Sequence, residues 1–302
     1  MHCLSDIEPQ PGVRHLKLPP LNIARPASVE EAVALLALHD GEAKIISGGQ
    51  SLMPMLAFRL AAPEMLIDLA LIPGLDSIAS DTSWTTIGAR CTWRMLEQDR
   101  HLVAAQPLLC SALPHIAHYQ IRNRGTVGGS LAHADPAAEL PAVAVTCDAM
   151  IDIVGTSGSR SVAAGDFFLA PMVAALDQAE MIVAIRLPAW PSKRRYAFSE
   201  FARRKGDFAL AGVALLFDLD GEGRIASPAI GAFGIGDVPM RLREAEAALT
   251  GALPSDEIFA SAVAACGGLQ TNSDLHADSD YRRALVQTLL GRCLGRAGGD
   301  QK

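Results

Sequence analysis

Two glycine-rich stretches decide how this chain folds and what it can hold: Ser47-Gly48-Gly49-Gln50-Ser51 and Gly125-Thr126-Val127-Gly128-Gly129-Ser130. They stand about 80 residues apart, and each follows apolar sequence and precedes a predicted helix. Paired glycines let the backbone approach a ligand closely and adopt positive φ, so that consecutive N–H groups can converge on an anion. One such loop is typical of a tight turn. Two of them, with Ser and Thr hydroxyls inside, predict one diphosphate held from two sides by N–H groups and helix N-termini.

Neither loop carries the common nucleotide-binding motifs. The Rossmann fingerprint G-x-G-x-x-G is absent from both loops. A P-loop, in which Gly-Lys-Ser/Thr follows a four-residue gap, is absent as well. The sequence therefore predicts a dinucleotide cofactor held by a different fold.

Around the first loop, the sequence predicts helices alternating with short strands. Ser28-Val29-Glu30-Glu31 is a capping box. In this motif the Ser28 side chain accepts the third backbone N–H of the helix, and the Glu31 side chain reaches back to the backbone N–H of Ser28. The helix that begins there ends at Asp40-Gly41, and residues 44–46 form a buried strand that leads directly into the loop. We expect the following elements to be a helix or turn over residues 52–60, a strand over 65–69 and a hairpin over 75–90.

The remaining sequence completes an α+β plan. The expected helices of its first half cover residues 92–99, 108–116 and 137–146, with Pro114 kinking or ending the second. Strands are expected over residues 149–154 and 180–187, before a linker at residues 188–191. Three strands joined by Gly-containing turns are then expected over residues 198–202, 209–218 and 225–233. Helices over residues 240–249, 256–266 and 280–294 follow them.

Composition excludes several classes of function. The 302 residues are 50% hydrophobic, so the chain can bury a large core. With a net charge of −7 and a pI of about 5.6, it lacks the dominant basic face of a nucleic-acid binder. The basic clusters at residues 193–195 and 203–205 are expected to be solvated, with a partner or phosphate contact as the alternative.

The sequence also bears on location. No stretch reaches the roughly 18 apolar residues of a membrane span, and Met1–Gln10 lacks the apolar run of a signal peptide. We therefore expect a cytoplasmic protein. The six cysteines are scattered without C-x-x-C or iron–sulfur spacing, so reduced, mostly buried thiols are expected.

Both loops, with their flanks, closely resemble the FAD-binding signatures of the medium subunits of carbon monoxide dehydrogenase and related molybdenum hydroxylases, and of the xanthine dehydrogenase flavin domain. The matching stretches are Ser47-Gly48-Gly49-Gln50-Ser51-Leu52-Met53-Pro54, Arg122-Asn123-Arg124-Gly125-Thr126-Val127-Gly128-Gly129-Ser130, and the flanks at residues 25–28, 66–69, 135–141 and 206–209. They occur in order and at the spacing of the family. The resemblance covers about residues 20–290, which is nearly the whole chain.

The resemblance implies a fold and a domain plan. The fold is the p-cresol methylhydroxylase type of FAD-binding domain, with two α/β subdomains that enclose the cofactor. It would occupy residues 1–190, with subdomains at about 1–70 and 71–190. Residues 191–302 would form a C-terminal domain with a small antiparallel sheet and helices.

The resemblance also implies a cofactor site. The residues it assigns to FAD are Ile46, Ser47, Gly48, Gly49, Gln50, Ser51, Leu52, Ile116, Thr126, Val127, Gly128, Gly129, Ser130, Glu139 and Ile182. The two loops would hold the phosphates and ribityl, Ile116 and Ile182 would pack near the ring system, and Glu139 would contact the nucleotide. Ser130 stands where the family has Asn, and Glu139 where it has Asp. Neither change should abolish binding, because backbone N–H groups would make most diphosphate contacts, but either can reposition part of the cofactor.

Finally, the resemblance implies a division of labour. A large subunit would carry molybdopterin and oxidise the substrate, and a small subunit would carry two 2Fe-2S clusters. The FAD of this chain would pass electrons from a cluster to an external acceptor, in a dimer of heterotrimers. The sequence is consistent with this division, because it has no ligands for an iron–sulfur cluster and no acid–base dyad beside the loops. The redox chemistry would therefore belong to the flavin, and no catalytic residue is assigned. No residue marks a covalent flavin link, and FAD is expected to bind non-covalently.

Two other functions remain open at this point. A stand-alone flavin oxidase or reductase of the same wide fold would need a base or an attachment residue near the ring. A non-catalytic nucleotide-binding or assembly protein could have kept the loops.

Among single residues, His115, His118 and His133 match no zinc spacing, so no metal is expected. We interpret Asp135 and Asp207 as turn carboxylates, and Tyr119 as covering either the flavin or the core.

Overall fold

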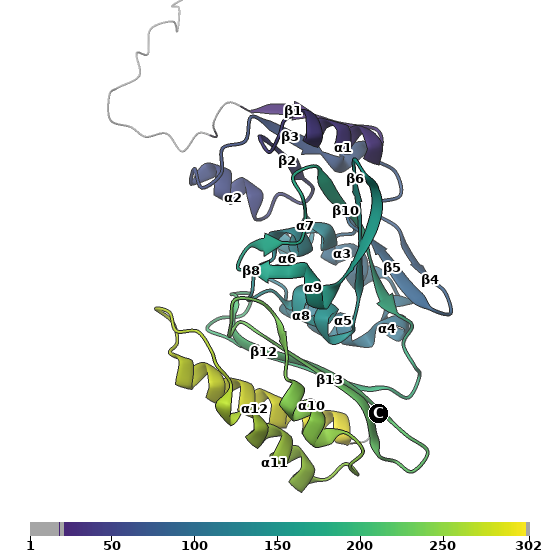
Figure 1. The fold of residues 1–302 in the computed structure, drawn as a ribbon, viewed down its shortest axis with the longest axis vertical. Coiled ribbons are helices and arrows are strands. Elements are labelled where there is room, and N and C mark those ends of the chain that lie inside the picture. Colours follow the sequence, from purple (N-terminus) through teal and green to yellow (C-terminus); the bar gives the residue numbers. More distant parts are fainter. Residues whose placement is uncertain (1–17, 19–20, 300–302) are drawn as a thin grey trace, which may run out of the picture.

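The computed structural model describes Leu18 and residues 21–299. Figure 1 shows three parts stacked along the long axis: a three-stranded sheet at one end, a five-stranded sheet in the middle, and a four-stranded sheet covered by helices at the other end. This mixture of sheets and packed helices confirms the predicted α+β plan.

The N-terminal sheet is parallel and has the strand order β1-β3-β2. Its elements are β1 (Asn22–Ala24), α1 (Val29–Leu38), β2 (Ala43–Ile46), α2 (Leu52–Ala57) and β3 (Met65–Asp68). Ser28 caps α1 as predicted, with its Oγ accepting the Glu31 N–H at 3.2 Å. The Glu31 carboxylate accepts the N–H of Ala27 instead of that of Ser28. The first glycine loop leaves the carboxyl end of β2, the edge at which parallel α/β sheets bind ligands.

The middle sheet is antiparallel and has the order β4-β5-β10-β6-β7. Its strands are β4 (Ile78–Ser80), β5 (Trp84–Gly88), β6 (Met150–Gly155), β7 (Gly158–Ala163) and β10 (Glu180–Pro188). Of these, only β7 was not predicted. It is an edge strand whose first four residues are exposed, so it lacks the apolar alternation that marks a strand in the sequence.

Short helices accompany the middle sheet. They are α3 (Trp93–Gln98), α4 (Leu102–Ala105), α5 (Pro107–Ala112), α6 (Tyr119–Arg122), α7 (Val127–His133), α8 (Glu139–Thr146) and α9 (Ala164–Phe167), followed by the hairpin β8 (Phe168–Ala170) and β9 (Val173–Ala174). As predicted, the α-helix at residue 107 stops before Pro114, which lies in a 3-10 turn. The second glycine loop leads directly into α7.

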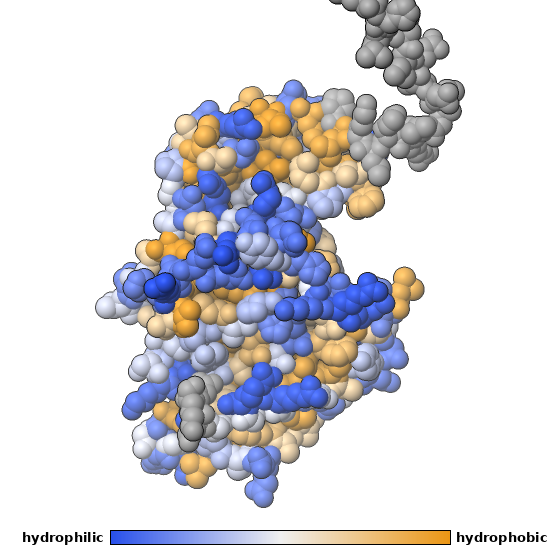
Figure 2. Space-filling view, turned by 180° about the vertical axis from the view of Figure 1, so that it is seen from behind, coloured by the Kyte–Doolittle hydropathy of each residue, from blue (hydrophilic) through white to orange (hydrophobic). Residues whose placement is uncertain are grey.

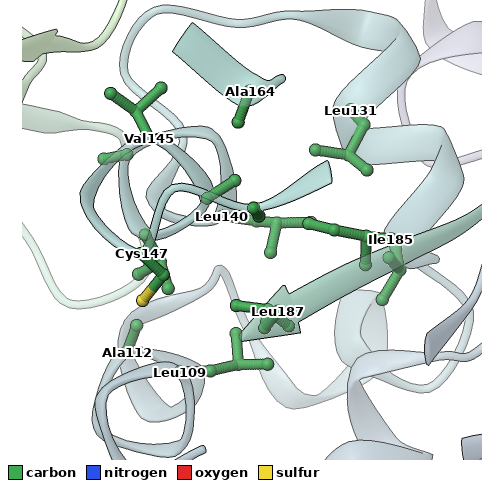
Figure 3. Packing of buried hydrophobic residues seen from close by; sticks show 14 of the residues in the cluster. Leu109, Ala112, Leu131, Leu140, Val145, Cys147, Ala164, Ile185 and Leu187 are labelled. Atoms are coloured by element: carbon green, nitrogen blue, oxygen red, sulfur yellow. The ribbon is translucent and has the colours of Figure 1, made fainter. Parts of the chain in front are cut away.

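Helix α8 lies at the centre of the largest hydrophobic cluster, and all eight of its residues are buried. Figure 3 shows Leu140 of this helix among side chains of α5, α7 and β10. The same cluster contains Phe198 and Phe233 of the C-terminal sheet, whose ring centroids are 5.8 Å apart. The middle and C-terminal parts therefore share one continuous core.

The C-terminal sheet has the order β11-β12-β13-β14. Its elements are β11 (Arg195–Ala202), β12 (Ala209–Leu219), β13 (Ile225–Phe233), β14 (Met240–Arg241), α10 (Arg243–Leu249), α11 (Asp256–Ala265) and α12 (Ser279–Gly298). The prediction of a helix from residue 240 was wrong at its start. Met240 and Arg241 pair with β13 as a short strand, so the helix begins at Arg243.

Strand β12 is buried on both faces. Val213 and Leu215 pack in a cluster with α10, α11 and α12, whereas Ala214 and Leu216 belong to the cluster around α8. This alternation follows from the period of two in a strand. The sheet is therefore sandwiched between its own helices and the middle part (Figure 1).

Cysteine and membrane features can be checked over the described residues. The thiols of Cys91, Cys110, Cys147, Cys266 and Cys293 are free, and all of these residues but Cys110 are buried, as predicted. Cys3 and the expectation of no signal peptide at Met1–Gln10 lie outside the described residues. No helix between residues 21 and 299 is long and apolar enough to cross a membrane.

Candidate functional site

The two glycine loops meet. The first loop is residues 47–51, and the second is residues 123–130, of which residues 127–130 form the first turn of α7. A Cβ atom placed on Gly48 would overlap the carbonyl oxygen of Arg124 and lie 3.0 Å from Cα of Gly125. Since no side chain fits there, only glycine allows the two backbones to come this close. The convergence that a shared ligand requires is therefore present.

The first loop leaves its backbone donors free. Gly49 has a φ of +72°, a conformation that favours glycine. Within the described chain, no acceptor is found for the backbone N–H groups of residues 48–51. The Oγ of Ser47 is buried and also lacks a hydrogen-bond partner there. Buried polar groups are nearly always paired, so this set of unpaired donors is an observation that points to a ligand.

The second loop and the start of α7 use most of their donors inside the protein. The Val127 N–H donates to the carbonyl of Cys91 at 2.9 Å, and the Gly128 N–H donates to the carbonyl of Ala89 at 2.8 Å. Val127 is fully buried, and a Cβ on Gly128 would lie 2.6 Å from the Cβ of Ala89. This segment is thus held rigidly against the residues that follow β5.

Thr126 caps α7. Its Oγ1 accepts the Gly129 N–H at 3.3 Å, and its carbonyl accepts the Ser130 N–H at 3.0 Å. Gly129 is exposed, and a Cβ there would approach only the Thr126 hydroxyl. The second loop therefore offers a ligand a preformed surface, but few free amides.

Two cavities adjoin the contact between the loops. The larger has a volume of about 480 Å³ and is lined by Leu18, Leu21, Ile23, Arg25, Ile46, Ser47, Gly48, Gly49, Gln50, Met53, Pro54, Leu66, Asp68 and Arg124. The smaller, of about 270 Å³, is lined by Ser47, Asp68, Ala70, Arg90, Thr92, Asn123, Arg124 and Thr126. Ser47, Asp68 and Arg124 belong to both walls.

Charged side chains around these cavities were not predicted as site residues. Asp68 forms an ion pair with Arg25 at 3.1 Å and accepts the Ala70 N–H. Arg90 donates to the carbonyl of Ala70 and to the carboxylate of Asp76. The sequence carried part of this signal, because the flanks at residues 25–28 and 66–69 belong to the resemblance. The spacing of these flanks in the sequence, however, does not predict that their charged side chains lie side by side in the fold.

Of the residues predicted to hold FAD, six line a cavity: Ile46, Ser47, Gly48, Gly49, Gln50 and Thr126. The other nine line neither cavity: Ser51, Leu52, Ile116, Val127, Gly128, Gly129, Ser130, Glu139 and Ile182. Ile116 and Ile182 are buried in the main hydrophobic cluster. Glu139 is the first residue of α8 and is also buried. Burial, with the nearby carboxylates of Glu200 and Asp135, raises the pKa of Glu139 to about 8. A carboxyl group in this environment is largely protonated at neutral pH.

The three histidines near the second loop do not converge. His115 Nδ1 lies 3.3 Å from the Oε1 atom of Glu200, whereas His118 packs against Gly206. Across the described residues, no group of three or more His, Cys, Asp or Glu side chains could hold a metal. Asp135 accepts the Ala137 N–H at 2.8 Å, which fits its interpretation as a turn carboxylate.

Tyr119 is half-exposed and is not part of the core. The guanidinium of Arg94 lies over its ring, 5.5 Å from the centroid. Both of its predicted roles, covering the flavin and covering the core, stay predictions. Asp207 is exposed in the turn between β11 and β12, as its interpretation as a turn carboxylate required.

Comparison with known proteins agrees with this geometry. Residues 19–190 match the family model of the FAD binding domain in molybdopterin dehydrogenase, and residues 196–297 match the CO dehydrogenase flavoprotein C-terminal domain. The chain is 38% identical over 283 residues to the alpha subunit of the 6-hydroxypseudooxynicotine dehydrogenase complex of Paenarthrobacter nicotinovorans, covering 93% of this chain and 96% of that protein. It is 35% identical over 273 residues to the carbon monoxide dehydrogenase medium chain of Hydrogenophaga pseudoflava, covering 90% and 95%.

The fold also matches that of a solved structure closely. Quinoline 2-oxidoreductase from Pseudomonas putida 86 superposes with a TM-score of 0.88 at 36% identity, covering 93% of this chain and 98% of that chain. Fold and site thus define a flavoprotein component of an oxidoreductase. The chain belongs to the family of FAD-binding domains in molybdopterin dehydrogenases, joined to the C-terminal domain of CO dehydrogenase flavoproteins. The resemblance, the fold type and the FAD cofactor predicted from the sequence are confirmed.

Proposed function

We propose that this chain is the FAD-carrying electron-transfer subunit of a heteromeric molybdenum hydroxylase. The observation that carries the proposal is the first glycine loop, in which the free N–H groups of residues 48–51 and the unpaired Ser47 hydroxyl stand beside two cavities. Such donors suit the diphosphate of FAD, so the residues present fit the cofactor. When bound, FAD supplies the redox chemistry that takes up and releases electrons.

The chain's own residues bind and orient the cofactor. Residues 46–52 would hold the diphosphate through backbone N–H groups, and residues 126–130 would support it from the opposite side. Ile116, Glu139 and Ile182 are buried and line neither cavity, and they remain in the proposed site on the strength of the resemblance. No acid–base dyad lies along the two cavities, since their acidic lining residue, Asp68, is paired with Arg25. The proposed role of the protein is therefore binding, without covalent attachment, and electrostatic control.

The domain plan is part of the proposal. We assign residues 1–190 to the FAD-binding domain, with subdomains at about 1–70 and 71–190, and residues 191–302 to the C-terminal domain. The separate three-stranded and five-stranded sheets support the division into subdomains. The turn between β10 and β11 supports the boundary near residue 190.

Partner subunits are also proposed. The names of the relatives, a subunit of a dehydrogenase complex and a medium chain, support assembly with a large molybdopterin subunit and a small 2Fe-2S subunit. Figure 2 shows hydrophobic surface gathered on the part that carries the N-terminal sheet. Exposed apolar side chains of residues 21–68 include Leu38, Phe58 and Leu60. Large exposed apolar patches often mark protein interfaces. A dimer of such heterotrimers, located in the cytoplasm, completes the proposal.

Flavin titration tests the function. We expect the purified full-length chain to bind FAD reversibly, to show a flavin absorption spectrum and to oxidise no substrate alone. Adding the subunits encoded by neighbouring genes should restore dehydrogenase activity. Turnover by the chain alone would instead support a stand-alone flavin enzyme. A colourless chain that refuses added FAD would support an assembly protein.

A further inference from the structure

Arg124 stands at the junction of the two cavities. Its backbone carbonyl lies against Gly48 of the first loop, and Arg124 is a lining residue of both cavities. Over residues 21–299, no hydrogen bond or ion pair of its guanidinium is found, and the residue is exposed. Binding of a diphosphate through backbone amides makes no use of this charge.

The other charges on the shared wall are already matched. The carboxylate of Asp68 pairs with Arg25 at 3.1 Å, and Arg90 bonds to two carbonyls and to Asp76. Asp68 and Arg25 therefore cancel, and Arg124 leaves the wall with one unmatched positive charge. On a chain with a net charge of −7, such a cation beside a set of free N–H donors is suited to an anion.

We infer that Arg124 is the residue that matches the charge of the FAD diphosphate, and that Asp68 opposes it. A guanidinium forms a planar fork of donors that fits phosphate oxygens. Amides alone contribute only partial charges, whereas Arg124 contributes a full one. Asp68 on the same wall holds Arg25 in an ion pair and so withholds that second cation from the diphosphate. The balance between Arg124 and Asp68 therefore tunes affinity. This inference rests on the proposed binding of FAD and adds a residue to that site.

The test separates the charge of the ligand from its shape. FAD, ADP and riboflavin are each titrated into the flavin-free full-length chain and into Arg124→Gln and Arg124→Lys. We expect Arg124→Gln to weaken FAD and ADP about tenfold at low salt, with the loss shrinking as salt rises, and to leave riboflavin unchanged. Arg124→Lys keeps the charge but loses the fork, so the loss should be about threefold.

A second variant distinguishes charge from structural damage. Asp68→Asn removes the opposing charge while keeping a side-chain oxygen to cap Ala70. We expect it to tighten FAD and ADP about threefold, a change opposite in sign to that of Arg124→Gln. Damage to the fold would weaken binding in both variants. The control is Arg292→Gln, an exposed arginine on α12 outside both cavities, which should bind every ligand as the wild type does.

Different results of these titrations would overturn the role of Arg124 and the proposed function. If the wild-type chain binds FAD and ADP, and Arg124→Gln binds them equally well, the inference is overturned while the proposed function stands. An equal loss of riboflavin affinity would also overturn it, because the effect would then be structural. A wild-type chain that binds neither FAD nor ADP would overturn the proposed function and the inference together.

Discussion

The two glycine loops look alike in sequence, but they play different roles. Residues 48–51 of the first loop leave their N–H groups without an acceptor in the described structure, and Ser47 has a buried, unpaired hydroxyl. At the second loop, Val127 and Gly128 donate their N–H groups to Cys91 and Ala89. One loop is therefore arranged to bind, and the other is arranged to stay rigid.

This difference teaches how a site can be both open and well ordered. Free donors bind a ligand well only if they are held in place before it arrives. Here the second loop provides that support, because α7 begins in it and its backbone carbonyl at Arg124 contacts Gly48. We expect changes in the first loop to act mainly on affinity, and changes in the second to act mainly on stability.

The largest effect is expected at the contact between the loops. Gly48→Val places a branched side chain where even a Cβ would overlap the Arg124 carbonyl, so the loops must separate. We expect a loss of FAD affinity of at least about 100-fold, because several hydrogen bonds are lost together. Flavin fluorescence titration measures it, with Gly295→Ala as the control, because Gly295 lies on α12 with open space around an added Cβ. Near-normal affinity for Gly48→Val would show that the loops bind independently.

The next effect should separate stability from binding. A side chain at Gly128 would clash with Ala89, because a Cβ added at Gly128 would lie 2.6 Å from the Cβ of Ala89. Gly128→Val should therefore lower the free energy of unfolding by about 1–3 kcal/mol through overpacking. Urea unfolding of the flavin-free chain measures this. If this variant lost affinity without losing stability, the second loop would be a binding loop like the first.

The pH dependence of stability should arise on the rigid side of the site. Glu139 follows the second loop and has a pKa raised from 4.5 to about 8, chiefly by burial. A raised carboxyl pKa means that the folded state keeps a proton that the unfolded state has lost. Stability should thus fall as pH rises from about 4.5 to 8, by at most about 1.4 kcal/mol per pH unit, and level off above. Glu139→Gln should remove this slope in urea unfolding series, and an unchanged slope would assign it to other groups.

The smallest effect is expected at the hydroxyl of the binding loop. Ser47→Ala removes a buried oxygen that has no partner within the described residues. The flavin-free protein should be as stable as the wild type, since no internal hydrogen bond is lost. Affinity for FAD should fall about fivefold, which corresponds to one hydrogen bond of roughly 1 kcal/mol. Lower stability with unchanged affinity would place this hydroxyl among the structural groups instead.

Much of the fold was readable because its signals are local. The cap at Ser28, the break before Pro114 and the strand ahead of the first loop all depend on neighbouring residues, and all are present. The errors came where pairing partners decide. β7 is a polar edge strand, and Met240 joins β13 instead of a helix. Neither outcome is encoded in the hydrophobic pattern of the segment itself.

The site was readable only in part. The sequence indicated both loops, but it treated Gly129 as equivalent to Gly49. In the structure Gly49 has positive φ, whereas Gly129 is a helical and exposed position. Arg124 was quoted within a motif without a role, because the direction of a side chain at a loop junction depends on a partner about 75 residues away in the sequence.

By itself, then, the sequence determined the order of the elements, the two glycine loops and the family to which they point, since turn chemistry and apolar periodicity act over a few residues. Only the tertiary structure decided which amides are free, which are used by the core, and which charges share a wall. Those properties depend on which atoms lie opposite each backbone N–H group and each charged side chain. The packing of the sheets against one another sets those neighbours.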